Sequence, residues 1–247
     1  MIKADIQFVR SLAEKRVRDQ ERLFVAEGSK LTEEILASKF VVRRIYTTRH
    51  DLKGKNIEVV DQREMERISQ LKSANDTLAV VEQPHYKLSV ANLRGKLIVA
   101  LDGVQNPGNL GTIIRLADWF GVEDIICSRD TADCFNPKVI QATMGAILRV
   151  RVHYTDNLPA LLQEAHREGL NIYGTLLDGG NIYDERLDAS GIIVMGNEGR
   201  GITEETRTAL THRLLIPPYP ADAPTSESLN VAMATGIILA EFRRQHR

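Results

Sequence analysis

From residue 96 onward, short apolar runs alternate with segments of helical periodicity, and this alternation limits the fold to few possibilities. The runs "LIVALDGV" (97–104) and "GIIVMG" (191–196) are typical of strands buried on both faces of a sheet. Strands that alternate with helices predict an α/β domain with a mainly parallel sheet. The further strands are expected at "DIICSR", "RVHYTD", "LNIYGTLLD" and "HRLLIPP", and the helices at "LGTIIRLADWFG", "PKVIQATMGAILRV", "LPALLQEAHREG", "TEETRTAL" and "SLNVAMATGIILAEFRRQ".

The first 80 or so residues show the same alternation on a smaller scale and predict a separate α/β domain. Its helices are expected at "IQFVRSLAEKRVRDQ", at "SKLTEEILAS" with Leu31, Ile35 and Leu36 on one side, and at "QREMERISQL". Its strands are expected at "RLFVAEG", "VVRRIYTT", "IEVVD" and "TLAVVEQ". The polar stretch "PHYKLSVANLRGK" indicates a linker, which gives domains at 1–84 and 96–247 joined by residues 85–95.

The composition of the 247 residues, 43% hydrophobic and 26% charged, is that of an ordinary globular protein. The N-terminus has no apolar signal core and no window of 18 uncharged apolar residues exists, so we expect a cytoplasmic protein without a membrane span. Cys127 and Cys134 are too few for a disulfide framework, and Cys127 is expected to be a buried hydrophobe. The six histidines are scattered, so no catalytic metal is expected.

The charge is distributed unevenly along the chain, although the formal net charge is only −1. The first 95 residues carry 18 Lys and Arg against 14 Asp and Glu, whereas the remainder carries 14 against 19. A basic front half points weakly to a nucleic-acid partner, and simple solvation of helix surfaces explains the same charges.

Three strands of the larger domain end in unusual polar loops. The first polar loop is "QNPGNLGTIIR" (105–115), the second is "GNEGRG" (196–201) and the third is "PPYPADAPTSESLN" (217–230). Ligands of open α/β sheets bind beyond the carboxyl ends of the strands, so we expect these loops to converge on one site. None of them carries the G-x-G-x-x-G fingerprint of a dinucleotide site.

Each loop offers polar side chains that have both a structural and a functional interpretation. Asn109 is placed to cap the helix that follows it. The guanidinium of Arg115 offers two parallel donors suited to a phosphate, or alternatively the side chain extends past apolar neighbours into solvent. Glu198 is placed to pair with Arg115, to accept from a ligand, or to complement a helix dipole. Ser228 is the obvious cap of the last helix, which leaves Asn230 inside its first turn without a structural reason.

Together, "NPGNLGTIIR", "VMGNEGRGI" and "IPP…SESLNVAMATGIILAE" resemble the three motifs of the SpoU (TrmH-like) family of RNA ribose 2′-O-methyltransferases in the SPOUT superfamily. They occur in the family's order and cover about residues 96–245. The first 80 or so residues resemble that family's RNA substrate-binding domain, best at "LFVAEGSKLTEEIL". One departure is the stretch "PYPADAPTSE", which is a few residues longer than the compact loop common in the family.

The resemblance implies a trefoil-knotted methyltransferase domain that works as a homodimer and binds S-adenosylmethionine in the loops of the knot. The family's cofactor positions fall on Gly196, Ile216 and Leu229. Its active-site positions fall on Asn109, Arg115, Glu198, Ser228 and Asn230. The implied reaction is transfer of a methyl group from a sulfonium to a ribose 2′-hydroxyl, for which the protein mainly supplies alignment.

The family's usual candidate base matches Arg115, yet arginine is a poor base because its pKa exceeds about 12. Our hypothesis is a split role, in which Arg115 binds the RNA phosphate and favours the alkoxide while the proton leaves through that phosphate or water. Asn109 would orient the ribose or Arg115, and Glu198 would fix one of the two. Phosphate contacts of the front domain are expected from five basic residues, Arg10, Lys15, Arg16, Arg18 and Arg22.

Ribosomal RNA is expected over transfer RNA by analogy, since the appended front domain is more usual among rRNA-directed relatives. Two other readings of the sequence stay open. One is a catalytically inactive RNA-binding module of the same fold, against which the presence of all five polar positions argues. The other is a nucleotide-dependent oxidoreductase on a doubly wound sheet, against which the missing fingerprint argues.

Overall fold

The computed structural model describes residues 1–220, 226 and 228–246, which form two compact units. The first unit consists of residues 1–85 together with 133–148, and the second consists of residues 86–132 together with the chain from 149 onward. Residues 221–225 and 227, which make up much of the longer stretch noted in the third polar loop, lie outside the described residues.

The second unit is built on a parallel sheet of six strands in the order β10-β8-β9-β5-β6-β7. This confirms the predicted α/β fold with a mainly parallel sheet. Every residue of β5 and β6 is buried, as the apolar runs indicated. The strands are β5 (Leu97–Asp102), β6 (Asp124–Ser128), β7 (Arg151–Thr155), β8 (Ile172–Asn181), β9 (Gly191–Gly196) and β10 (His212–Leu215).

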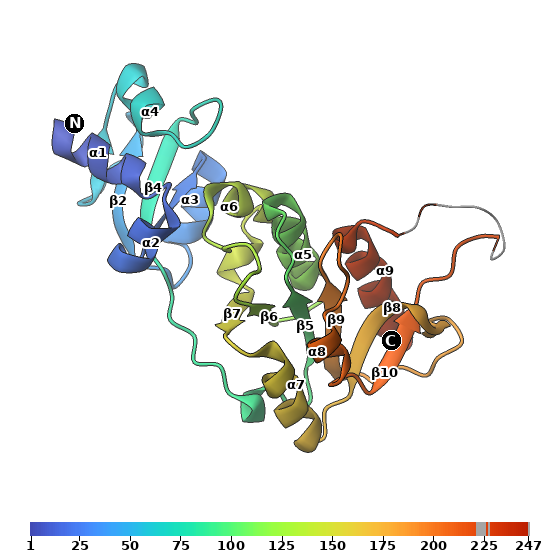
Figure 1. Cartoon of the computed structure of the whole chain (residues 1–247). Helices are drawn as coiled ribbons and strands as arrows, with labels where there is room; N and C mark the ends of the chain where they lie inside the picture. The colour runs from blue at the N-terminus through green and yellow to red at the C-terminus, as the bar shows by residue number, and fades with distance from the viewer. Residues whose placement is uncertain (221–225, 227, 247) are drawn as a thin grey trace. The chain divides into compact units, whose positions relative to one another are not determined.

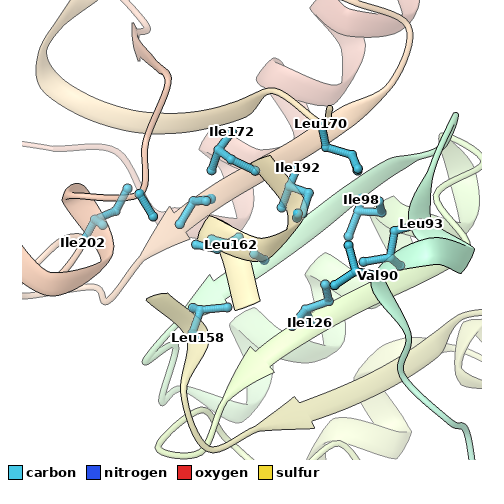
Figure 2. Close-up of a cluster of buried hydrophobic side chains, with 14 of the residues drawn as sticks. Val90, Leu93, Ile98, Ile126, Leu158, Leu162, Leu170, Ile172, Ile192 and Ile202 are labelled. Carbon is cyan, nitrogen blue, oxygen red and sulfur yellow. The ribbon is translucent and has the colours of Figure 1, made fainter. Parts of the chain in front are cut away.

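Helices cover both faces of this sheet (Figure 1). On one face, α7 (Leu158–Arg167) and the 3-10 helix η1 (Val90–Leu93) pack against alternate residues of the central strands. Figure 2 shows Leu158 and Leu162 of α7 beside Ile126 and Ile192 of the sheet. The short α8 (Glu204–Arg207) packs against α7 on that same face, whereas α5 (Pro107–Trp119) and α9 (Val231–Arg244) lie side by side on the other face. The core therefore lies on both sides of the sheet and leaves the strand ends accessible.

Strand β8, which lies between β10 and β9, departs from the regular pattern. It pairs with β10 at Tyr173 and Gly174, and the pairing resumes only at Gly180, so residues 175–179 bulge out of the ladder. At Gly179 the bulge passes so close to β10 that an added Cβ would lie 2.6 Å from the carbonyl carbon of Leu214. Only glycine fits there, and the bulge reaches beyond the expected strand end at residue 178.

The first unit has a mixed sheet in the order β1-β4-β2-β3. Its expected elements are present, but "IQFVRSLAEKRVRDQ" forms two helices rather than one, and Leu36 is 51% exposed rather than part of the apolar side. The strands are β1 (Leu23–Glu27), β2 (Val42–Thr47), β3 (Ile57–Val59) and β4 (Thr77–Glu82), and the helices are α1 (Lys3–Ser11), α2 (Lys15–Glu21), α3 (Ser29–Leu36) and α4 (Gln62–Ile68).

The helix predicted at "PKVIQATMGAILRV" also belongs to the first unit and is shorter than expected. It begins at Pro137, as predicted, but α6 (Pro137–Thr143) ends where Met144 and Gly145 take positive φ angles of 50° and 88°. A 3-10 turn, η2 (Ala146–Leu148), follows. The ring of Phe135, just before α6, packs against that of Phe24 in β1 with centroids 4.9 Å apart.

Both cysteines are buried, which confirms the expectation for Cys127. Across the described ranges, no helix has the length and apolar character to cross a membrane. The same residues contain no group of three or more His, Cys, Asp or Glu side chains placed to hold a metal ion.

A buried charge cluster lies at the amino end of β6. Asp124 is 4% exposed and accepts hydrogen bonds from Arg151 Nε at 2.8 Å and Arg151 Nη2 at 2.7 Å, and its Oδ1 lies 2.9 Å from His153 Nε2. Burial alone would raise the pKa of Asp124, but the bonds from His153 and Arg151 outweigh it and hold that pKa far below its ordinary value. The ionised carboxylate therefore stabilises the fold.

We expect Asp124→Asn to lower the free energy of unfolding by about 2 kcal/mol at pH 7, because it leaves Arg151 without its buried partner. Since the folded pKa of Asp124 is lowered, this stabilisation is present above the unfolded pKa of about 4 and is lost as the pH falls further. Urea unfolding at pH 7 and at pH 3 measures it. Asp156→Asn, in an exposed pair with Arg129, is the matched control and should cost less than about 0.5 kcal/mol at either pH. A deficit for Asp124→Asn that is equal at both pH values would contradict the assignment.

Candidate active site

The three polar loops follow β5, β9 and β10 at the carboxyl edge of the parallel sheet, as predicted. The second polar loop closes on itself through two backbone hydrogen bonds of 3.0 Å between Asn197 and Gly201. The Asn197 side chain donates from Nδ2 to the carbonyl of Gly103 at 2.6 Å, which ties the turn to the end of β5. The second loop is thus held against the start of the first.

Glu198 joins these two loops through its carboxylate. It accepts from the backbone N–H groups of Gln105 at 3.3 Å and Asn106 at 3.1 Å, and from Asn109 Nδ2 at 3.0 Å. Burial opposes ionisation of Glu198, but the donors outweigh it and lower the pKa of the carboxyl below its ordinary value. Glu198 is therefore a fixed anion at neutral pH, and it orients Asn109 rather than pairing with Arg115.

Asn109 links Glu198 to the last helix. Its Oδ1 accepts from Asn230 Nδ2 at 3.0 Å, and Asn230 Oδ1 accepts from the N–H groups of Ala232 at 3.0 Å and Met233 at 3.2 Å. Because helix N–H groups only donate and a carboxylate only accepts, neither amide can turn over without losing hydrogen bonds. The result is a chain of two oriented amides between the Glu198 carboxylate and the start of α9, which we call the amide relay.

These contacts correct both expected helix caps. The cap of α5 is Asn106, whose Oδ1 accepts from Gly108 and Asn109 N–H groups, so Asn109 lies inside the first turn with its side chain free for the amide relay. The cap of α9 is Asn230 and not Ser228. The proline at residue 107 fixes the start of α5 three positions earlier than a cap at Asn109 would give.

A cavity of about 470 Å³ lies beside the amide relay. Gly196, Ile216 and Leu229, the three cofactor positions of the sequence prediction, all line it, as do Glu198 and Ser228. Its wall is polar and apolar in similar measure and comes from β8, β9, β10, α9 and the second polar loop, with Leu176, Met195, Ile202, Leu214, Val231, Ala234 and Ile238 as its apolar lining residues. The structure therefore gathers around one space residues from Thr175 to Ile238, which are 63 positions apart in the sequence.

Arg115 stands apart from this group. It is exposed on α5, and its guanidinium makes no hydrogen bond or ion pair within the described part of the chain. Six residues of helix separate it from Asn109, about 9 Å along the axis. The predicted contact between Arg115 and Glu198 is therefore wrong for the single chain. Asn109 bonds to both Glu198 and Asn230, Ser228 lines the cavity, and Arg115 bonds to none of these residues.

Sequence reasoning missed several residues of this site. Asn197 precedes Glu198 in a glycine-rich turn and had a signal of its own, since an asparagine there commonly bonds to nearby backbone. Arg207 and the β8 bulge also line the cavity. Nothing local marks them, because the bulge depends on the register shift between β8 and β10 and Arg207 reaches the cavity only once α8 has packed.

The predicted RNA-binding residues of the first unit divide into two kinds. Arg10, Lys15, Arg16 and Arg22 are exposed, with Lys15 paired to Asp19 at 2.6 Å. Arg18, by contrast, is 1% exposed: it donates to the Leu12 and Ala13 carbonyls and to Asp133 Oδ2 at 2.6 Å. The prediction for Arg18 is wrong, since its guanidinium holds the start of the unit to residue 133 and has no free donor face for a phosphate.

Two family models match the chain. The SpoU rRNA methylase family matches residues 96–240, and the MRM3-like substrate-binding domain matches residues 3–88. The protein therefore belongs to the SpoU rRNA methylase family. It is 32% identical over 241 residues, 95% of this chain and 94% of the relative, to the 23S rRNA (guanosine(2553)-2′-O)-methyltransferase RlmP of Bacillus subtilis.

Other relatives agree with this assignment. The 23S rRNA (guanosine-2′-O-)-methyltransferase RlmB of Neisseria meningitidis is 36% identical over 150 residues, which are 60% of this chain and 58% of RlmB. Among solved structures, a TrmH-family protein of Porphyromonas gingivalis is 38% identical and covers 99% of both chains with a TM-score of 0.88. The AdoMet-bound rRNA methyltransferase of Sinorhizobium meliloti is 28% identical and covers 98% of this chain and 95% of its own, with a TM-score of 0.85.

The capping assignment for α9 predicts distinct stabilities for three variants. Asn230→Ala should lower the free energy of unfolding by about 1 kcal/mol, whereas Asn230→Ser, which keeps an accepting oxygen without adding a charge, should change it by less than about 0.5 kcal/mol. Ser228→Ala is the matched control and should be neutral. Urea unfolding measures all three, and a loss for Ser228→Ala as large as that for Asn230→Ala would show that Ser228 is the cap after all.

Proposed function

We propose that this protein transfers a methyl group from S-adenosylmethionine to a ribose 2′-hydroxyl of ribosomal RNA. The observation that carries the proposal is the amide relay, with its fixed anion Glu198, at the rim of a cavity in a chain of the SpoU family. Relatives named as 23S rRNA 2′-O-methyltransferases support ribosomal RNA as the substrate.

The cavity fits the proposed methyl donor in size and in chemistry. About 470 Å³ lies within the range of roughly 300–1,000 Å³ usual for small-ligand sites, and the apolar side chains among the lining residues suit the flat face of an adenine. We propose that Gly196, Ile216 and Leu229 hold the donor largely through their backbone groups, in loops that form a trefoil knot. The bound donor supplies an already activated methyl group, so the chain's own task is to align the acceptor hydroxyl and help its proton leave.

Arg115 is proposed to act on the RNA rather than on the methyl donor. A free guanidinium binds a phosphate in a bidentate manner and stabilises the negative charge that develops on the ribose oxygen. Arg115 is a poor base, so the proton leaves through the bound phosphate or a water. Glu198 and Asn230 hold Asn109 in one orientation. Its second Nδ2 hydrogen and the second lone pair of its Oδ1 are then available to the ribose.

A homodimer would bring Arg115 into such a site. On the paired helices α5 and α9, Trp119 is 83% exposed and Met233 is 64% exposed, although both are large apolar side chains. Arg115 lies one turn before Trp119 on α5. We propose that a second copy covers this face and that the complete site includes residues from both copies, in a cytoplasmic protein.

The first domain, proposed to span residues 1–84, is assigned to RNA binding. The match of residues 3–88 to a substrate-binding domain supports this role, as do the exposed cations Arg10, Arg16 and Arg22. Residues 85–95 would connect it to the methyltransferase domain, 96–247. A catalytically inactive module is disfavoured, because a protein without a methyl donor has no use for both the cavity and the amide relay.

Mapping of 2′-O-methylated riboses in ribosomal RNA tests the function directly. One methylated position should disappear from cells that lack the protein and return when the wild-type chain is supplied. Arg115→Lys should restore little methylation and should lower kcat/KM of the purified protein roughly tenfold or more, because lysine cannot form the bidentate contact.

Near-normal turnover of Arg115→Lys would refute the proposed geometry of Arg115 while leaving the reaction in place. An unchanged methylation map in cells lacking the protein would refute ribosomal RNA as the substrate. Asn230→Ser is a useful companion, since it keeps the helix cap but lacks the amide nitrogen that donates to Asn109. It should lose activity without losing stability.

For the RNA-binding face, we expect the double variant Arg10→Gln/Arg16→Gln to weaken RNA binding and to reduce the slope of log K against log salt by about 1.5. The reason is that RNA binding releases fewer counterions when two phosphate contacts are missing. Filter binding at several salt concentrations measures the slope. Arg63→Gln/Arg67→Gln, two exposed arginines of α4 in the same unit, is the matched control. Equal effects of the two double variants would mean that general charge, not this face, binds the RNA.

A further inference from the structure

The cavity beside the amide relay is lined by four charged side chains, Asp178, Glu198, Arg200 and Arg207. Three of them are already compensated. Asp178 pairs with Arg213 at 3.2 Å, Glu198 accepts from the first polar loop, and Arg200 pairs with Asp130 at 3.4 Å. Arg200 is also 65% exposed, so water screens what charge remains on it.

Arg207 differs from the other three. Its side chain is 33% exposed at the end of α8, and its Nε donates to the carbonyl of Ile202 at 3.3 Å. The nearest carboxylate is Glu204, which is 85% exposed and lies 3.6 Å from that same Nε. The two terminal nitrogens of Arg207 bond to none of the residues that the structure describes.

A half-buried guanidinium with two free terminal nitrogens is suited to an anionic ligand. The hydrogen bond from Nε to the Ile202 carbonyl already orients the guanidinium. Less side-chain entropy is therefore lost when the two terminal nitrogens bind a ligand. A planar carboxylate matches that fork with two parallel hydrogen bonds. Adenine and ribose carry no charge, so the carboxylate of the methionine moiety is the one anionic group that a bound methyl donor would bring.

We propose that Arg207 binds the carboxylate of S-adenosylmethionine and thereby selects donors that carry an intact amino-acid moiety. This inference rests on the proposed function, because it concerns a ligand of the same cavity. It adds a specificity residue that lies outside the three polar loops, on the helix between β9 and β10.

The test compares two donors that differ in the carboxylate alone, S-adenosylmethionine and decarboxylated S-adenosylmethionine. Calorimetry on the full-length protein gives the Kd of each for the wild type, Arg207→Met and Arg207→Lys. Wild type should prefer S-adenosylmethionine, and Arg207→Met should weaken it roughly 10- to 100-fold while leaving the decarboxylated compound within about twofold. Arg207→Lys should lie between, since it keeps a charge but loses the fork. Arg200→Met, a second cation of the same cavity, should leave the ratio of the two Kd values unchanged.

Equal weakening of both compounds by Arg207→Met would overturn the assignment and indicate a structural role for Arg207. Unchanged donor binding combined with weaker RNA binding would overturn it too, in favour of an RNA phosphate as the partner. A wild-type protein that binds neither compound would refute the donor site itself, which separates failure of the proposed function from failure of this inference.

Discussion

The Glu198 carboxylate is the anion on which the arrangement of the three polar loops depends. It accepts from the backbone of Gln105 and Asn106 and from the side chain of Asn109, so two loops that are about 90 residues apart in sequence share one acceptor. An ionised carboxylate in a partly buried place is stable only while such donors surround it. The hydrogen-bond donors of the first polar loop offset the cost of burying the Glu198 charge. The same hydrogen bonds hold that loop in place.

The amide relay extends this order to the third polar loop. Asn230 caps α9 with its oxygen and directs its nitrogen at Asn109, so the beginning of a structural helix and the orientation of a proposed catalytic amide are one feature. Function and stability are therefore separable at Asn230, because capping needs only its oxygen and the contact to Asn109 needs only its nitrogen. This also explains why an asparagine, rather than a serine or aspartate, stands at that position.

Three arginines of this chain show how tertiary context assigns different roles to the same side chain. Arg18 is buried and neutralised by Asp133, Arg115 is exposed with its donors free, and Arg207 lines the cavity with one nitrogen bound. In the sequence, Arg18 lies among other cations of a polar helix and looks like its exposed neighbours. Its partner Asp133 is 115 residues away in the sequence, so no local pattern around Arg18 predicts the pairing.

The sequence by itself determined the alternation of strands and helices, the parallel sheet and the edge at which the polar loops gather, because apolar periodicity and buried strands are local properties. It also placed Gly196, Ile216 and Leu229 at one site through the family resemblance, and the structure lines one cavity with all three. Only the tertiary structure decided which asparagine caps each helix, that Arg18 is buried, and that Arg207 faces the cavity. Those outcomes depend on hydrogen bonds and register between segments distant in the chain, and such contacts exist only after the segments have packed.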